Sequence, residues 1–223
     1  MNFRPLKIYW AGDLFDAKDL GGNLLLADAI EQIAADRYRV MLPQNGECEI
    51  KDRTAQGIRD ADFELLFNSD VLVANFDGHD LDSGTVTEFC FAKMLDMPSV
   101  LLRTDFRHSG DHTLSDTDPW NLMCSGYPRT KVLHINGMER YWQSRETVAD
   151  HRLLLNQYYS SIASEVIQAL DEVTAMRSWL RRGELPLQLQ MAVRSIGGTL
   201  SSRLNAEKIS TLVKEKTAAN LYS

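Results

Sequence analysis

The stretch V-L-V-A-N-F at residues 71–76 decides the fold of this chain. It is almost wholly apolar, and such a run is typical of a strand that is buried on both faces of a parallel sheet. Four further runs have the same character, at residues 6–11, 38–43, 98–103 and 131–135. Helical patterns separate these runs, over residues 23–35, 52–68 and 85–95. The sequence therefore predicts an α/β fold in which helices cover both faces of a sheet of about five parallel strands.

The last third of the chain has a helical character. From about residue 140 to residue 182, apolar residues recur at steps of three and four, which predicts one long helix. Two shorter helical segments follow, punctuated by Gly183, Pro186 and the pair Gly197-Gly198. We expect a main domain over residues 1–182 and a helical C-terminal extension over residues 183–223.

Composition excludes several classes of partner. The formal net charge is -7, and no face rich in Lys and Arg is visible, which argues against a nucleic-acid partner. No apolar stretch is long enough to span a bilayer and the N-terminal residues lack a signal-peptide core, so we expect a cytoplasmic protein with no membrane partner. The three cysteines lack CxxC spacing and the five histidines lack an HxxxH pair, which indicates neither a disulfide framework nor a metal site.

The segment D-S-G-T-V-T-E, residues 82–88, follows the strand at residues 71–76, where open α/β sheets form their ligand crevices. Two interpretations of Glu88 are open. In one, Thr85-x-x-Glu88 is a capping box, and Glu88 bonds back to the Thr85 backbone N–H. In the other, the first turn of a helix keeps Glu88 ionised through the helix dipole, and its carboxylate is a nucleophile. Gly84 permits a tight turn and close approach of a ligand, while Asp82 on the incoming loop is placed to accept a hydrogen bond from a substrate hydroxyl.

Asp62 is a second carboxylate of interest. It lies three and four residues before Leu65 and Leu66, on an apolar stripe of its predicted helix. Burial there would raise its pKa, and a carboxylic acid that stays protonated near neutrality can serve as a general acid. The alternative is that Phe63 and Phe67 form the buried face and that Asp62 lies in solvent. In retaining glycoside chemistry, an ionised carboxylate is the nucleophile and a protonated carboxylic acid is the general acid. An ionised Glu88 and a protonated Asp62 would fit these two roles.

Tyr9 lies near the carboxyl end of the first predicted strand, and Gly12 marks the turn that leaves it. A phenol at this place can donate a hydrogen bond to a catalytic carboxylate, although most strand tyrosines are structural. The pair Gly21-Gly22 falls in a predicted loop over residues 16–23. This loop has neither a GxGxxG nor a GxxxxGK[ST] pattern, so a phosphate cradle is only weakly indicated.

The chain resembles the nucleoside 2-deoxyribosyltransferase family in three motifs: Ile8-Tyr9-Trp10-Ala11-Gly12, Asp62 eight residues before Asp70, and Asp82-x-Gly84-Thr85-x-x-Glu88. The similarity extends from about Lys7 to Ile135, and Asn121-Leu122-Met123 fits a further family element. It implies a five-stranded, doubly wound, flavodoxin-like catalytic domain. It also implies a homo-oligomer, from dimer to hexamer, with sites at subunit contacts, and no metal or organic cofactor.

The resemblance implies a retaining double displacement in nucleoside salvage. Glu88 would attack C1′ of a 2′-deoxynucleoside, giving a covalent deoxyribosyl enzyme and a free nucleobase, and a second nucleobase would then attack. Asp62 would protonate the departing base and deprotonate the incoming one, and Tyr9 would position Glu88. The residues expected to contact the substrate are Asp82, Gly12, Gly84, Asn121 and Met123. Among these, Asp82 and a neighbouring subunit's Asn121 would hold the 5′-hydroxyl, and Met123 would line the pocket.

Two other functions compete with transfer. A nucleotide N-glycosidase of the same superfamily uses the same glutamate but delivers the sugar to water, and it binds a 5′-phosphate. Asp82 would repel a phosphate dianion, which favours a 5′-hydroxyl and hence a deoxynucleoside substrate. A non-catalytic nucleoside or nucleotide sensor is the second alternative, and the presence of Glu88 argues against it.

Overall fold

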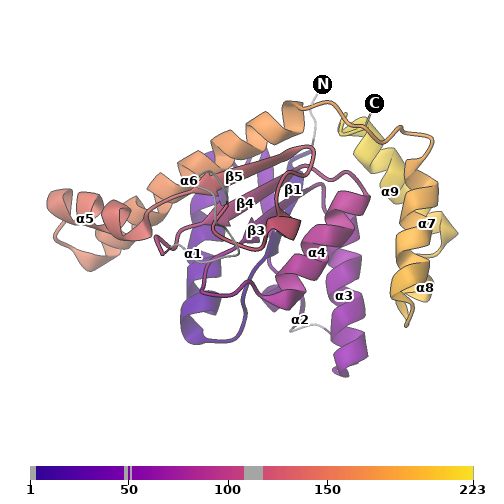
Figure 1. Ribbon diagram of the computed structural model, residues 1–223, viewed down its shortest axis with the longest axis horizontal. Helices are drawn as coiled ribbons and strands as arrows, with labels where there is room; N and C mark the ends of the chain where they lie inside the picture. The colour runs from indigo at the N-terminus through magenta and orange to yellow at the C-terminus, as the bar shows by residue number, and fades with distance from the viewer. Residues whose placement is uncertain (1–3, 48–49, 51, 108–117, 223) are drawn as a thin grey trace.

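A computed structural model describes residues 4–47, 50, 52–107 and 118–222. At its centre lies a five-stranded, all-parallel sheet with the strand order β2-β1-β3-β4-β5 (Figure 1). The strands are β1 (Leu6–Ala11), β2 (Tyr38–Met41), β3 (Val71–Asn75), β4 (Ser99–Arg103) and β5 (Thr130–His134). The order reverses between β1 and β3, at the point where doubly wound sheets open a crevice beyond the carboxyl ends of their strands. The predicted α/β fold and its five strands are confirmed.

Helices cover both faces of the sheet, which explains why its strands are so apolar. The helices α1 (Ala17–Ala34) and α6 (His151–Ala175) pack on one face, and α3 (Ala55–Asn68) and α4 (Ser83–Met94) pack on the other (Figure 1). Since successive side chains of a strand point to opposite faces, Ile8 and Trp10 face α1 and α6, while Tyr9 faces α3 and α4. Tyr9 is thereby placed on the same side of the sheet as residues 82–88.

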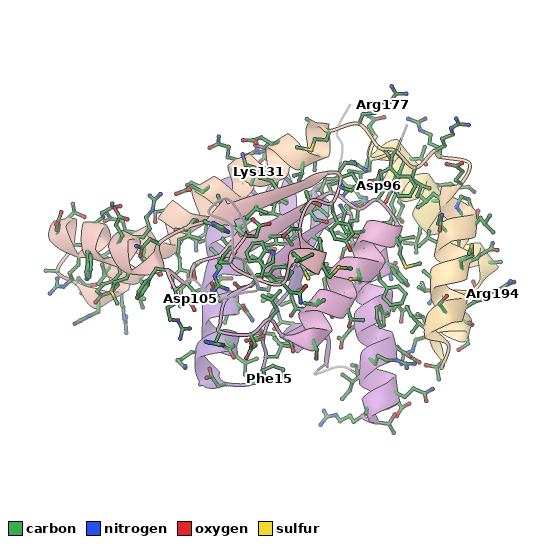
Figure 2. All side chains as sticks on the ribbon, viewed as in Figure 1. Phe15, Asp96, Asp105, Lys131, Arg177 and Arg194 are labelled. Atoms are coloured by element: carbon green, nitrogen blue, oxygen red, sulfur yellow. The ribbon has the colours of Figure 1, made fainter. Side chains whose placement is uncertain are left out.

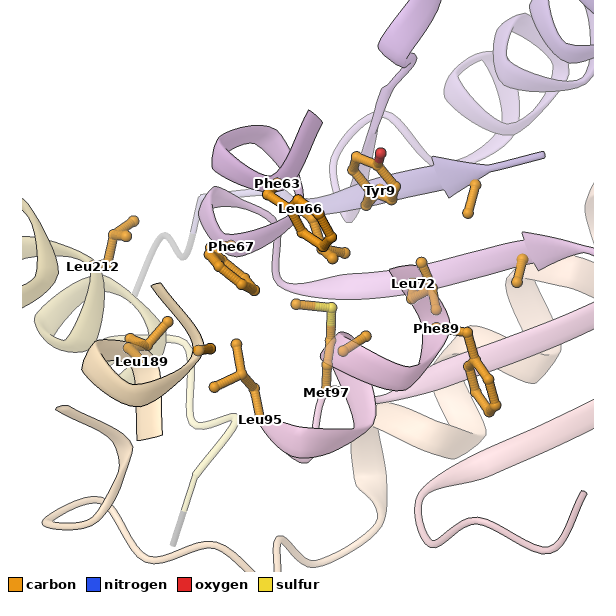
Figure 3. Close-up of a cluster of buried hydrophobic side chains, with 14 of the residues drawn as sticks. Tyr9, Phe63, Leu66, Phe67, Leu72, Phe89, Leu95, Met97, Leu189 and Leu212 are labelled. Carbon is orange, nitrogen blue, oxygen red and sulfur yellow. The ribbon is translucent and has the colours of Figure 1, made fainter. Parts of the chain in front are cut away.

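The C-terminal helices form a further layer outside α3 and α4 (Figure 1). They are α7 (Leu185–Ile196), α8 (Leu200–Arg203) and α9 (Ala206–Ala218). Leu189 and Leu212 from this layer join Phe67 and Leu95 in one buried cluster (Figure 3). The extension therefore shares its apolar core with the helices that carry the candidate acids.

The boundaries of α1 and α6 differ from the sequence predictions because aspartates cap these helices. Asp16 accepts hydrogen bonds from the backbone N–H groups of Lys18 and Asp19, so α1 begins at Ala17 and the predicted loop over residues 16–23 is wrong. Asp150 caps α6 in the same way. The single long helix predicted over residues 140–182 is therefore two helices, α5 (Gly137–Thr147) and α6, and α6 ends at Ala175.

Two short elements complete the described part of the chain. They are the helix α2 (Pro43–Glu47) and the 3-10 helix η1 (Leu122–Cys124). Among the helices in the described ranges, none combines the length and the apolar character that crossing a bilayer requires. Three of the residues counted in the sequence analysis, Cys48, His108 and His112, lie outside the described residues.

A buried polar cluster around Asp96, labelled in Figure 2, ties the start of the C-terminal layer to the sheet. Asp96 Oδ2 accepts hydrogen bonds from the Ser178 hydroxyl at 2.6 Å, from the Trp179 backbone N–H at 2.9 Å and from the Arg129 guanidinium at 3.1 Å. Both Asp96 and Arg129 are buried. The loss of the carboxylate would leave a buried guanidinium without its counter-charge.

Asp96→Asn should lower the free energy of unfolding by about 3 kcal/mol, because it removes one partner of a buried ion pair while keeping the shape of the side chain. Urea denaturation measures this change. Glu172→Gln, which breaks the solvent-exposed pair of Lys131 and Glu172, is the control and should leave the midpoint almost unchanged. Equal midpoints for the wild type and Asp96→Asn would contradict this account.

Candidate active site

A hydrogen bond between Tyr9 and Glu88 marks the site at the crevice between β1 and β3. The Tyr9 hydroxyl donates to Glu88 Oε1 at 2.5 Å. Tyr9 has no exposed surface, and Glu88 is half-buried. The structure thus brings together two residues that are 79 positions apart in the sequence.

Asp82, and not Thr85, is the N-cap of α4. Asp82 Oδ2 accepts hydrogen bonds from the Thr85 backbone N–H at 2.6 Å and from the Thr85 hydroxyl at 2.9 Å. The helix therefore begins at Ser83, and Glu88 lies in its second turn with its side chain on Tyr9. The capping box, one of the two interpretations left open for Glu88, is wrong, because the aspartate three residues before Thr85 satisfies the Thr85 backbone N–H group.

The ionisation of Glu88 also differs from the prediction. Burial is the largest cause of a raised pKa at Glu88; the hydrogen bond from Tyr9 opposes the rise, the charges of Asp62 and Asp82 add to it, and the resulting pKa is about 8. The expectation that the helix dipole keeps Glu88 ionised is therefore wrong for the protein without substrate. With a pKa of about 8, Glu88 holds a proton at neutral pH in the protein without substrate.

Asp62 lies half-buried on α3, where its charge acts on Glu88. Phe63 and Phe67 form the buried face of this helix, as one of the two interpretations predicted (Figure 3). Asp60, on the same helix, has no exposed surface. Asp62 is thus partly buried and close enough to Glu88 for its charge to raise the Glu88 pKa.

Gly12 and Gly84 occupy positions where a side chain has little room. A Cβ atom on Gly84 would lie 3.0 Å from Asp82 Oδ2, and one on Gly12 would lie 3.2 Å from the Cβ of Asn75. Gly12 therefore allows the loop after β1 to lie close to the end of β3, and Gly84 allows the tight turn at the start of α4.

Two hollows flank the Tyr9–Glu88 pair without being lined by it. A cavity of about 270 Å³ lies on the side of α1 and α6, with Trp10, Asp13 and Tyr158 among its lining residues. A hollow of about 750 Å³ lies on the outer side of α4, and Ser83 and Asn121 are among the residues that line it.

Asn121 and Met123 lie in the second hollow and not beside Tyr9 and Glu88. Asn121 caps η1 by accepting a hydrogen bond from the Met123 backbone N–H at 2.9 Å. Both residues are exposed, and Met123 has 70% of its surface accessible. Within one chain they are not joined to the carboxylates, so their role at a neighbouring subunit's site stays a prediction.

Asp13 is an acidic residue of the crevice that the sequence analysis did not single out. It follows Gly12 on the loop from β1 to α1. Asn23 fixes this loop, since the Trp10 indole donates to Asn23 Oδ1 at 2.9 Å and Asn23 Nδ2 donates to the Asp13 carbonyl at 3.1 Å. Burial raises the pKa of Asp13, and the charge of Asp82 raises it further. Its place directly after the exit of the first strand was the available signal.

The family model described as nucleoside 2-deoxyribosyltransferase matches residues 8–123, more than half of the 223 residues. This range contains Tyr9, Asp62, Asp82 and Glu88, as well as Asn121 and Met123. The chain belongs to the nucleoside 2-deoxyribosyltransferase family. A comparison with curated proteins gives no match.

Two solved structures are similar to this member of the family. A conserved protein from Enterococcus faecalis V583 is 23% identical, with 75% of this chain and 98% of that chain covered and a TM-score of 0.47. A 2-deoxyribosyltransferase from the psychrotolerant bacterium Bacillus psychrosaccharolyticus is 18% identical, with 66% of this chain and 95% of that chain covered and a TM-score of 0.43. In the part of the chain that the structure describes, no group of three or more His, Cys, Asp or Glu side chains is arranged to hold a metal ion.

The buried carboxyl of Glu88 makes the stability of the protein depend on pH. Its folded pKa of about 8 lies above the ordinary value of 4.5, so the folded state keeps a proton that the unfolded state loses. This contribution to stability is present below pH 4.5 and is lost as pH rises through 8. Glu88→Gln cannot ionise, so its stability relative to the wild type should increase by up to about 5 kcal/mol across this window.

Urea denaturation of both proteins at pH 5, 7 and 9 measures the difference. Tyr9→Phe is the matched control: it removes the hydrogen bond that lowers the Glu88 pKa, so its loss of stability with pH should be at least as steep as that of the wild type. Parallel pH curves for the wild type and Glu88→Gln would show that Glu88 titrates normally.

Proposed function

We propose that this protein transfers 2-deoxyribose between nucleobases by a retaining double displacement through Glu88. The observation that carries the proposal is the hydrogen bond from Tyr9 to Glu88 at the crevice, with the carboxylates of Asp62 and Asp82 close enough to shift the Glu88 pKa. Membership of the nucleoside 2-deoxyribosyltransferase family supports the substrate class. The catalytic residues all fall within residues 1–182, which we assign as the catalytic domain.

Proton sharing between Glu88 and Asp62 explains how a buried glutamate can attack. When one proton is held by the pair, the reactive arrangement has it on Asp62 and leaves Glu88 charged. Glu88 then forms a bond to C1′ while the bond from C1′ to the base nitrogen breaks, and Asp62 gives its proton to the departing base. In the second half, the incoming base returns a proton to Asp62 and displaces Glu88 from C1′.

Tyr9 and Asp82 have different tasks in this scheme. The Tyr9 hydroxyl donates to Glu88 Oε1, which orients the carboxylate and leaves Oε2 for the attack. Thr85 occupies Asp82 Oδ2 through two hydrogen bonds, so we assign Oδ1 to the 5′-hydroxyl of the sugar. A second negative group at this place would be repelled, which favours a deoxynucleoside over a nucleoside 5′-monophosphate.

Asn121 and Met123 are assigned to the site of a neighbouring subunit in a homo-oligomer. Their support is their exposure on η1, next to the hollow on the outer side of α4. A second copy of the chain placed there would bring an amide and an apolar side chain toward a bound nucleoside.

The reaction itself is tested by incubating the protein with 2′-deoxyadenosine and free hypoxanthine and separating the products by chromatography. We expect 2′-deoxyinosine and adenine in equal amounts, because both half-reactions pass through the same sugar intermediate. Glu88→Ala should lower the rate at least about 10³-fold while the protein stays folded. Free deoxyribose without 2′-deoxyinosine would indicate a hydrolase, and no consumption of substrate would contradict both activities.

The shared proton predicts the direction of the pH profile. For 2′-deoxyadenosine, kcat/KM should fall as pH rises through about 8, the pKa of Glu88, because the last proton of the pair is then lost and Asp62 has none to give. Tyr9→Phe should move this fall to higher pH, since its hydrogen bond lowers the Glu88 pKa. A rise of kcat/KM through pH 8 would show instead that Glu88 titrates alone as a simple nucleophile.

A further inference from the structure

Asp60 on α3 is a buried carboxylate that the proposed reaction does not use. Its Oδ2 accepts hydrogen bonds from the Thr199 backbone N–H at 2.6 Å and from the Thr199 hydroxyl at 2.8 Å. The Arg59 guanidinium donates to Oδ1 at 2.6 Å. Burial by itself would raise the pKa of Asp60, but the hydrogen bonds from Arg59 and Thr199 outweigh it and hold the pKa below its usual range. A charged carboxylate thus joins α3 to the C-terminal layer.

The turn before Thr199 is shaped for this contact. Gly198 has a φ of +62°, which favours glycine, and a Cβ atom there would lie 2.4 Å from Asp60 Oδ2. Only a residue without a side chain lets the backbone approach the carboxylate so closely.

Glu64 adds a second tie on the same face of α3. It lies four residues after Asp60, so the two side chains share one side of the helix. Glu64 Oε2 pairs with Arg203 at 3.2 Å, and Glu64 Oε1 pairs with Lys208 at 3.4 Å. The C-terminal layer therefore holds α3 by two acidic side chains one turn apart.

Asp62 lies on the other side of α3. Two residues along a helix correspond to a rotation of about 200°, so Asp62 lies on the side of α3 away from Asp60. Its charge raises the pKa of Glu88, so Asp62 is within electrostatic reach of the site. In the half of α3 that precedes Asp62, the buried residues among those described are Gly57 and Asp60. Glycine has no side chain, so Asp60 supplies the buried side chain of this half. The rotation of this half of the helix is thus fixed by hydrogen bonds, whose directions allow less freedom than apolar contacts.

We propose that Asp60 and Thr199 are positioning residues, through which the C-terminal layer holds α3 in the rotation that aims Asp62 at the nucleobase. This inference rests on the proposed function, in which Asp62 is the general acid. It predicts that residues 183–223 affect the protonation of the leaving base and not only the stability of the fold.

The test compares two substrates at pH 6 that differ in their need for a proton. The base of 2′-deoxyguanosine must be protonated to leave, whereas the base of 7-methyl-2′-deoxyguanosine already carries a positive charge. Thr199→Val removes the hydroxyl but keeps the backbone N–H bond and the side-chain volume. It should lower kcat about tenfold for 2′-deoxyguanosine, since a general acid contributes about 10²- to 10⁴-fold, and less than about twofold for the methylated substrate.

Three variants make the comparison specific. Thr199→Ser keeps the hydroxyl and should restore the wild-type rate. Asp60→Asn keeps the shape of the carboxylate and should give the same selective loss as Thr199→Val. Thr211→Val is the matched control, because Thr211 is an exposed threonine of the same layer that bonds only within its own helix, to the Glu207 carbonyl at 3.1 Å; it should leave both rates unchanged.

The outcomes separate this inference from the proposed function. An equal loss on both substrates, or no loss on either, would show that Asp60 and Thr199 have a structural role only and would overturn the positioning role alone. Asp62→Asn is the benchmark and should show the same selectivity with a larger loss. A wild-type protein that is inactive on both substrates would overturn the proposed function and this inference with it.

Discussion

The burial of the Glu88 carboxyl against Tyr9 is the constraint on which the rest of the site depends. A carboxylate in this place loses its hydration, and it gains a hydrogen bond from the Tyr9 hydroxyl at 2.5 Å. The parallel sheet makes this contact possible, because β1 and β3 end at the same edge and α4 starts immediately beyond it. Two further carboxylates, Asp62 and Asp82, raise the cost of charging Glu88. Glu88 therefore keeps a proton at neutral pH, and the proposed reaction requires that this proton move to Asp62 before Glu88 attacks.

Magnitudes explain why burial outweighs the helix dipole at Glu88. A helix N-terminus stabilises a nearby negative charge by about 0.3–1 kcal/mol, and the effect falls off within the first turn. A rise of the pKa from 4.5 to about 8 corresponds to roughly 5 kcal/mol in the opposite direction. The position of the N-cap sets how far Glu88 lies from the start of the helix. Because Asp82 caps a helix that begins at Ser83, Glu88 lies in the second turn, where the effect of the dipole is weak. One aspartate thus both fixes the helix start and removes most of the support that the helix could give to an ionised Glu88.

The sequence predicted what depends on periodicity and missed what depends on distant partners. Strands such as residues 71–76 were predictable because burial on both faces demands an apolar run, and Tyr9, Asp62 and Glu88 could be picked out by their places relative to strands and helices. The starts of α1 and α4 were missed because Asp16 and Asp82 each cap earlier than the apolar pattern begins. The burial of Asp60 could not be predicted at all, since its partner Thr199 is 139 residues away and nothing in the local pattern of α3 marks the contact.

Charged groups are buried where the C-terminal layer contacts α3 and α4. We interpret them as fixing how these helices are placed relative to one another. Besides Asp60, the layer buries Lys216, whose ammonium donates to the Ser69 carbonyl and whose pKa burial lowers to about 8. Replacing such groups by apolar side chains often leaves a protein as stable or makes it more stable, so stability alone gives no reason to keep them. Apolar contacts such as those of Leu189 tolerate small shifts between helices, whereas the two directed hydrogen bonds from Thr199 to the Asp60 carboxylate do not. We interpret the charged contacts as the interactions that fix the rotation of α3. The apolar cluster of Figure 3 surrounds them and stabilises the packing of the layer.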